Sequence, residues 1–190
     1  MGRVGQRCAV VTMFLDIDEV VVDLMTPLSR VHGLTFDRQN WPNEYDLAKV
    51  FGKSQEEVWK PVRGSEFWST LPKTPWADDL VALLRAEFPD RLCFLSHGME
   101  LDPWSFAGKV RWLQEHFPGV PYLLGADKSF VGRPGAFLVD DYEKNETKWQ
   151  KAGGTAILFP APWNRFRGHP DPVGLVERMI RERRREQDMI

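Results

Sequence analysis

The chain has 190 residues, of which 43% are apolar and 27% charged, with a formal net charge of −2. This composition is typical of an ordinary soluble globular domain with room for a small insertion. The near-neutral charge argues against a nucleic-acid polymer as partner. No apolar run approaches the roughly 18–20 residues that a bilayer-spanning helix requires, so we expect no membrane association.

The two cysteines, Cys8 and Cys93, both lie in apolar, strand-like runs. We interpret them as buried free thiols of a protein in a reducing compartment. The apolar run near the N-terminus is too short for a signal peptide, and charged residues soon interrupt it. Together these features predict a cytoplasmic protein.

Short apolar runs rich in β-forming residues predict five strands, over residues 9–17, 91–97, 120–126, 136–141 and 155–161. Amphipathic helical patterns occupy residues 78–88 and 108–117, a polar one occupies 143–154, and a closing helix is expected over 172–190. Apolar strands that alternate with helices indicate βαβ units. The predicted fold class is therefore α/β, with a Rossmann-like parallel sheet of about five strands and helices on both faces.

The segment from Leu24 to Thr74 interrupts this alternation. It contains no convincing strand, is rich in aromatic residues, and has a helical pattern around residues 54–62. We interpret residues 24–74 as a small helical cap inserted after the first strand. Residues 1–23 and 75–190 are then expected to form the α/β core.

Polar residues stand at the carboxyl ends of four of the predicted strands or directly after them: Asp16 and Asp18, Ser96 and His97, Asp127 and Lys128, and Asp140 and Asp141. Ligands bind at the carboxyl ends of the strands in open parallel sheets, so these side chains are expected to converge. Carboxylates that lie so close together need a cation, and Mg²⁺ commonly combines one or two carboxylates with a substrate phosphate. A single Asp pair could instead cap a helix or form a turn. Two pairs that each follow an apolar strand favour a metal and phosphate site.

The stretches "DIDEVVVD", "LSHG", "GADK" and "LVDDYEKN" resemble, in this order, the motifs of the haloacid dehalogenase superfamily of phosphatases. Within it, the chain resembles the 5′(3′)-deoxyribonucleotidase family. That family typically shows D-x-D-G-V-L-A-D, which Asp16, Asp18, Val20 and Asp23 match. The resemblance covers about residues 10 to 160, and the helical insertion also matches the small cap of the family.

The resemblance implies a role for each matching residue of the first motif. Asp16 is expected to be the nucleophile that forms an aspartyl-phosphate. Asp18 is expected to act as general acid and then as general base, and its backbone carbonyl to bind the metal. Both belong to the expected Mg²⁺ site, together with Asp141 as a carboxylate ligand and Asp140 beside it.

The later motifs imply the phosphate-binding residues. Ser96 matches the phosphate-binding hydroxyl, and Lys128 matches the lysine that precedes the last acidic motif, with Lys109 as the alternative. His97 stands where a small residue is common. It could contact the phosphate or the leaving group, or cap the following loop, and we favour the loop.

One residue of the first motif departs from the family pattern. Glu19 replaces the usual glycine, which eases a backbone turn next to the phosphate. A glutamate at this place adds negative charge close to an anionic substrate, which puts the rate and the substrate size in question.

Aromatic residues of the cap are the candidates for holding the substrate. Phe67 and Trp68 lie where the family places aromatics that hold the base, and Trp41 and Tyr45 are further candidates. Alternatively, these residues form the core of the cap; we expect most to do so and one or two to line the site. Residues 159–166, "FPAPWNRF", are expected to form a fixed loop at the rim, to which the pattern assigns no role.

These features predict a Mg²⁺-dependent phosphatase, in particular a 5′-nucleotidase for (deoxy)nucleoside monophosphates. One alternative is a phosphatase for another small phosphate ester; the other is a catalytically silent nucleotide-binding protein on this fold. The expected partner is a small phosphorylated substrate. The pattern leaves a homodimer open.

Overall fold

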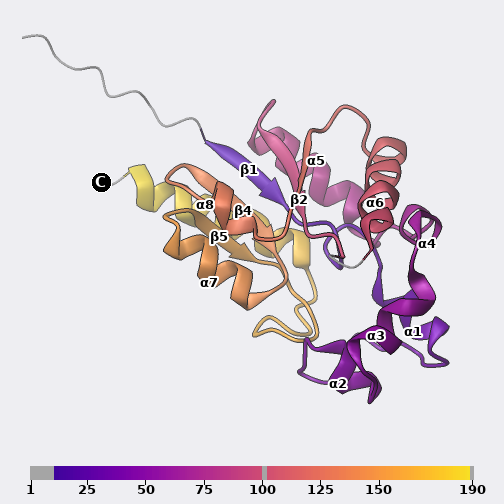
Figure 1. Ribbon diagram of the computed structural model, residues 1–190. Helices are drawn as coiled ribbons and strands as arrows, with labels where there is room; N and C mark the ends of the chain where they lie inside the picture. Colours follow the sequence, from indigo (N-terminus) through magenta and orange to yellow (C-terminus); the bar gives the residue numbers. More distant parts are fainter. Residues whose placement is uncertain (1–10, 100–101, 189–190) are drawn as a thin grey trace, which may run out of the picture.

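The computed structural model describes residues 11–99 and 102–188 of the chain; Cys8 and the start of the run 9–17 lie outside these residues. One parallel sheet has the strand order β3-β2-β1-β4-β5 (Figure 1). Its strands are β1 (Thr12–Leu15), β2 (Leu92–Ser96), β3 (Tyr122–Leu124), β4 (Ala136–Asp140) and β5 (Thr155–Leu158). The helices of the core are α5 (Ala77–Glu87), α6 (Pro103–His116), the 3₁₀ turn η2 (Lys128–Val131), α7 (Glu143–Lys151) and α8 (Pro172–Asp188). The predicted α/β fold class is confirmed, and each of the five predicted strands is present within its predicted range.

Side chains alternate between the two faces of the sheet, and different helices cover each face. In β1, Met13 and Leu15 belong to the larger cluster, which also contains buried residues of α5, α6 and α8. Phe14, between them, belongs to a smaller cluster with Trp149 of α7. Both faces are therefore buried, as expected for the apolar runs of a parallel sheet.

Helix α6 begins earlier than its hydrophobic pattern indicated. The Asp102 side chain accepts a hydrogen bond from the Trp104 backbone N–H at 3.2 Å, and Pro103 occupies the first helical position. An aspartate cap followed by proline is a favourable helix start, because neither residue leaves an unpaired backbone donor there.

The segment between β1 and α5 contains short helices and no strand in the described structure. They are α1 (Met25–Val31), α2 (Leu47–Phe51), α3 (Gln55–Trp59), the 3₁₀ turn η1 (Lys60–Val62) and α4 (Ser65–Ser69). Figure 1 shows this segment at lower right, beyond the tip of β1. We call residues 24–74 the cap segment; its status as a separate subdomain stays a prediction.

The cap segment approaches the core closely along α6. A Cβ atom at Gly108 would lie 2.5 Å from the backbone oxygen of Ser65 and 2.5 Å from Cβ of Trp68. Only glycine allows this contact between α4 and α6. It brings Trp68 of the cap segment next to the carboxyl end of the sheet.

Cys93 on β2 is half-buried rather than fully buried, and burial raises the pKa of its thiol to about 11. The thiol is therefore protonated and unreactive at neutral pH. Among the described helices, none combines the length and apolar character needed to cross a bilayer.

Candidate active site

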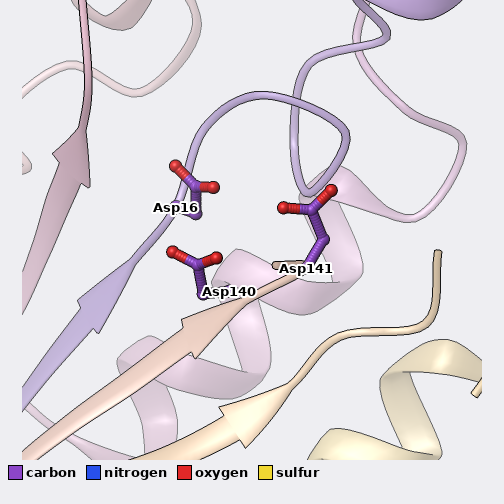
Figure 2. A group of neighbouring side chains, drawn as sticks. All are labelled: Asp16, Asp140 and Asp141. Carbon is purple, nitrogen blue, oxygen red and sulfur yellow. The ribbon is translucent and has the colours of Figure 1, made fainter. Parts of the chain in front are cut away.

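Three carboxylates meet at the carboxyl edge of the sheet, where its two central strands end. β1 pairs with β4 so that Leu15 lies opposite Val139, and Asp16 and Asp140 therefore emerge side by side. Figure 2 shows Asp16, Asp140 and Asp141 around a common space. One carboxylate oxygen of each lies within 4.8 Å of the other two, and all three residues are buried.

Lys128, at the start of η2, lies between two of these carboxylates. Its Nζ is 2.5 Å from Asp16 Oδ1 and 2.6 Å from Asp140 Oδ2. Burial by itself lowers the pKa of Lys128, but the charges of Asp140 and Asp16 outweigh it and raise the pKa above its ordinary value. The lysine is therefore a permanent cation at the base of the site.

Asp140 and Asp141 differ in how their carboxylates are occupied. Asp140 accepts hydrogen bonds from the Tyr142 backbone N–H, from Asn145 Nδ2 and from Lys128. Within the described part of the chain, Asp141 accepts one, from the indole Nε1–H of Trp163 at 3.1 Å. Asp140 thus anchors Lys128 and the start of α7, while Asp141 has more capacity left for a ligand.

The acidic cluster carries more negative charge than Lys128 can balance. Burial raises the pKa of Asp16 to about 7, although Lys128 opposes the shift. Burial, followed by the charges of Asp16 and Asp140, raises the pKa of Asp141 well above its ordinary value. Oxygen donors that repel one another at this spacing are suited to a hard divalent cation such as Mg²⁺. The donor set therefore fits the expected metal.

A second lysine–carboxylate pair lies beside the first. Lys109 of α6 is buried, and its Nζ contacts Asp18 Oδ2, Ser96 Oγ at 3.0 Å and the His97 carbonyl at 2.7 Å. The Asp18 side chain is 27% exposed, and its Oδ1 has no hydrogen-bond partner among the described residues. Sequence reasoning treated Lys109 and Lys128 as alternatives, whereas the structure places both at the site.

His97 is exposed and lies where the loops after β2 and β3 meet. Its ring Nδ1 is 2.8 Å from the carbonyl oxygen of Ala126. The contact holds the two loops together, and His97 also lines the cavity described next.

A cavity of about 400 Å³ separates the acidic cluster from the cap segment. Its walls include Asp16, Asp18, Ser96, Lys109, Lys128 and Asp141 from the core, and Tyr45, Asp46, Gln55, Trp59 and Trp68 from the cap segment. Of the four aromatic candidates, Tyr45 and Trp68 therefore line the cavity. Trp41 and Phe67 are not among its lining residues.

The positions of the other two aromatics have a simple explanation. Trp41 is buried and packs against Phe36 and Phe51 inside the cap segment. Phe67 packs edge-on against its neighbour Trp68, with 5.5 Å between the ring centroids. Both belong to the packing behind the cavity wall, as sequence reasoning expected for most of the cap aromatics.

Glu19, the departure from the family pattern, has its own partners. Its backbone has a φ of 57°, the left-handed conformation in which glycine is favoured. Its Oε1 accepts hydrogen bonds from the Leu24 and Met25 N–H groups at the start of α1, at 3.0 and 2.8 Å. Its Oε2 forms an ion pair with Arg38 at 3.1 Å. The negative charge of Glu19 is thus balanced by Arg38. Burial still raises the pKa of Glu19 to about 7.

Sequence reasoning missed several residues that hold this site together. Asn145 lies inside the motif "LVDDYEKN", five residues after Asp140 and in the first turn of α7. This spacing in the sequence could have predicted its contact with Asp140. Trp163 and Asn164 lie in the loop of residues 159–166, which received no role. Arg38 could not be assigned, because nothing in the local sequence pairs it with Glu19.

One protein family matches most of this chain. A family profile described as "5' nucleotidase, deoxy (Pyrimidine), cytosolic type C protein" matches residues 9–171, which is most of the chain. The chain belongs to this family. As a member, the protein is a phosphatase of the 5′-nucleotidase type, and its substrate is a small phosphorylated molecule.

Two solved structures share the fold of this chain. A provisionally named phosphoglycolate phosphatase from Lactobacillus delbrueckii subsp. bulgaricus has a TM-score of 0.54 at 16% identity, over 90% of this chain and 91% of that chain. A haloacid dehalogenase superfamily hydrolase from Ehrlichia chaffeensis has a TM-score of 0.52 at 12% identity, over 89% and 97% of the two chains. A search of curated proteins found no significant match.

Proposed function

We propose that this protein is a Mg²⁺-dependent 5′-nucleotidase that hydrolyses (deoxy)nucleoside monophosphates through an aspartyl-phosphate on Asp16. The observation that carries the proposal is the buried group of Asp16, Asp140 and Asp141, which faces a cavity with two lysines on its wall. The family description, with its deoxy and pyrimidine terms, supports this substrate class.

Asp16 is the proposed nucleophile because it lies at the floor of the cavity, directly after β1. Its Oδ1 is held by Lys128 and by the Ile17 backbone N–H at 2.7 Å. The other oxygen attacks phosphorus, and the ester oxygen leaves. Splitting the displacement into two steps with a covalent intermediate is ordinary nucleophilic catalysis.

Asp18 is the proposed proton carrier, two residues further on. Its carboxylate lines the cavity, and we assign to it the proton that the leaving oxygen takes up in the first step. In the second step the same carboxylate accepts a proton from the water that attacks the aspartyl-phosphate. Its pairing with Lys109 keeps it in place for both transfers.

The remaining residues would neutralise and orient the phosphate. Asp16, Asp141 and the backbone carbonyl of Asp18 would hold Mg²⁺, with Asp140 beside them; the ion would supply positive charge at the phosphoryl oxygens. Ser96 Oγ and Lys109 Nζ, 3.0 Å apart, form a donor pair for a phosphate oxygen. Lys128 fixes the charge balance around the nucleophile.

The cap wall of the cavity supports a nucleoside as the rest of the substrate. A volume of about 400 Å³ falls in the range of small-molecule sites. Trp68 is 2% exposed and lines the cavity, and its indole N–H has no partner among the described residues. Trp59 also lines the cavity and stacks on Trp68, with 6.2 Å between the ring centroids, so the two rings form an aromatic wall that suits a nucleobase.

The test is a phosphate-release assay on a panel of mononucleotides and sugar phosphates, with Mg²⁺ and with EDTA. We expect release from nucleoside monophosphates in Mg²⁺ and none in EDTA. Release from sugar phosphates alone would exclude the nucleotidase. Nucleotide binding without any phosphate release would favour a catalytically silent nucleotide-binding protein. Glu19 gives no support to that alternative, because its charge is paired with Arg38.

A further inference from the structure

We infer that Trp163 is a positioning residue that orients the carboxylate of Asp141 and couples it to the cap segment through Tyr45. The inference rests on the proposed function, because it assigns Asp141 to the metal site. It gives a role to the loop of residues 159–166.

Trp163 is held firmly by its neighbours in this loop. Asn164 is 5% exposed, and its Nδ2 donates to the carbonyl oxygens of Asp141 and Phe159, both at 2.8 Å. Arg165 makes a bidentate contact with Glu146 of α7, with both distances 2.6 Å. The backbone on which Trp163 sits is thus tied to the strand end that carries Asp141.

The indole N–H of Trp163 sets the orientation of the Asp141 carboxylate. It donates to Asp141 Oδ2 at 3.1 Å, and within residues 11–99 and 102–188 no other donor to that carboxylate is found. Asp140, by contrast, is held by Lys128, Asn145 and a backbone N–H. Since one hydrogen bond fixes Asp141, its loss is expected to leave the carboxylate free to rotate away from the cation. Outer hydrogen bonds of this kind orient metal ligands.

Trp163 also contacts the cap segment. Tyr45 meets the Trp163 ring edge-on, with centroids 5.7 Å apart and an interplanar angle of 84°. The same Tyr45 ring stacks on Tyr142, which follows Asp141 in the chain, at 3.6 Å and 15°. A shift of the cap segment therefore changes the packing on both residues next to Asp141. The position of the cap segment and the affinity for the cation are therefore expected to be coupled. Because such a coupling is reciprocal, cation binding should in turn favour one position of the cap segment.

The first experiment measures Mg²⁺ binding to EDTA-stripped protein by isothermal titration calorimetry. Trp163→Phe keeps a ring against Tyr45 and removes the indole N–H, so we expect the Kd for Mg²⁺ to rise about 10- to 100-fold. Trp104→Phe is the matched control, because Trp104 is 64% exposed on α6, and its Kd is expected to stay unchanged. An unchanged Kd in folded Trp163→Phe overturns the inference.

The second experiment tests the coupling by a double-mutant cycle. Tyr45→Leu is expected to raise the Kd for Mg²⁺ several-fold in the wild-type background and to add little in the Trp163→Phe background. Additive effects of the two substitutions overturn the coupling.

If Trp163→Phe does not fold, the inference is tested instead on the wild type, by the assigned indole N–H signal of Trp163 in the ¹H–¹⁵N spectrum. We expect Mg²⁺ to shift this signal, and an unshifted signal overturns the inference.

The outcomes separate this inference from the proposed function. Wild-type protein that binds Mg²⁺ but releases no phosphate from mononucleotides overturns the proposed function and leaves the role of Trp163 in cation binding intact. An active wild type with equal Mg²⁺ affinity in Trp163→Phe overturns the inference alone. Wild-type protein that binds no Mg²⁺ overturns both.

Discussion

The sheet edge and the cap segment face each other across the cavity, and different interactions hold them in place. At the sheet edge, Asp16, Asp140 and Lys128 are themselves buried, and direct ion pairs hold them together. On the cap side, α2, α3 and α4 have five residues each, too few to be stable without packing. Tyr45, which contacts Tyr142 and Trp163 in the loops after β4 and β5, is 44% exposed.

This difference assigns different tasks to the two walls. A network that buries its charges and pairs them keeps its geometry, as chemistry at phosphorus requires. A wall of short helices and aromatic contacts can shift and repack, which suits substrate entry and selection. Changes at the sheet edge should therefore abolish turnover, and changes on the cap wall should alter substrate affinity.

The largest expected effect is at the sheet edge. Asp16→Asn should lower kcat by about 10⁴-fold or more, because it removes the nucleophile. The melting temperature should stay close to that of the wild type, since the amide replaces a carboxylate whose burial is unfavourable. Steady-state phosphate release and a thermal melt measure the two properties.

Asp23→Asn is the matched control for this variant. Asp23 also belongs to the first motif, but its Oδ1 accepts the Thr26 backbone N–H at 3.0 Å, a bond that asparagine can keep. Its kcat should remain near the wild-type value. Retained turnover in Asp16→Asn would show that the nucleophile is assigned wrongly.

A smaller effect is expected on the cap wall, where two adjacent aromatics differ in position. Trp68→Leu should raise KM for a nucleoside monophosphate roughly tenfold or more, since stacking on a base contributes about 1–3 kcal/mol. Phe67→Leu should change KM little, because Phe67 does not line the cavity. Equal KM values for the two variants would contradict the assignment of the cap wall.

The link between the two walls can be tested at Glu19. Glu19→Ala leaves the first N–H groups of α1 and the Arg38 guanidinium without their acceptor. We expect a loss of about 1–3 kcal/mol in the free energy of unfolding, and a melting temperature lower by about 2–4 °C per kcal/mol. Glu19→Gln keeps an acceptor for the N–H groups and should lose less. Equal stability of wild type and Glu19→Ala would refute this role.

The last expected effect is the pH dependence of the metal-free protein. The pKa values of Asp16 and Glu19 are about 7 in the folded state and near 4 in the unfolded chain. The folded state then binds more protons, so the stability from these groups is present below about pH 4 and is lost as the pH rises through 7. The melting temperature in EDTA should therefore fall between pH 5 and pH 8.

Two controls sharpen this pH prediction. Mg²⁺ should flatten the fall, because a cation favours the ionised carboxylates. Glu19→Gln should show a shallower fall than the wild type. A melting temperature that rises with pH in EDTA would contradict the assigned direction of both shifts.

Local patterns in the sequence predicted the parts of the fold that depend on burial along one element. The run 136–141 indicated a strand buried on both faces, and β4 occupies Ala136–Asp140. Asp16 and Asp140 could be recognised because each stands at the carboxyl end of such a run. Their convergence followed from a general property of parallel sheets, since ligands bind where the strands end.

Only the tertiary structure decided contacts between residues far apart in the chain. Glu19 binds Arg38, and Arg38 in turn donates to the Pro160 carbonyl at 2.6 Å, which no local pattern encodes. Trp68 lines the cavity while its neighbour Phe67 does not, because the close approach of α4 to Gly108 fixes how α4 is turned. Periodicity in a sequence records which face of an element is buried, whereas the partner across that face depends on strand order and packing.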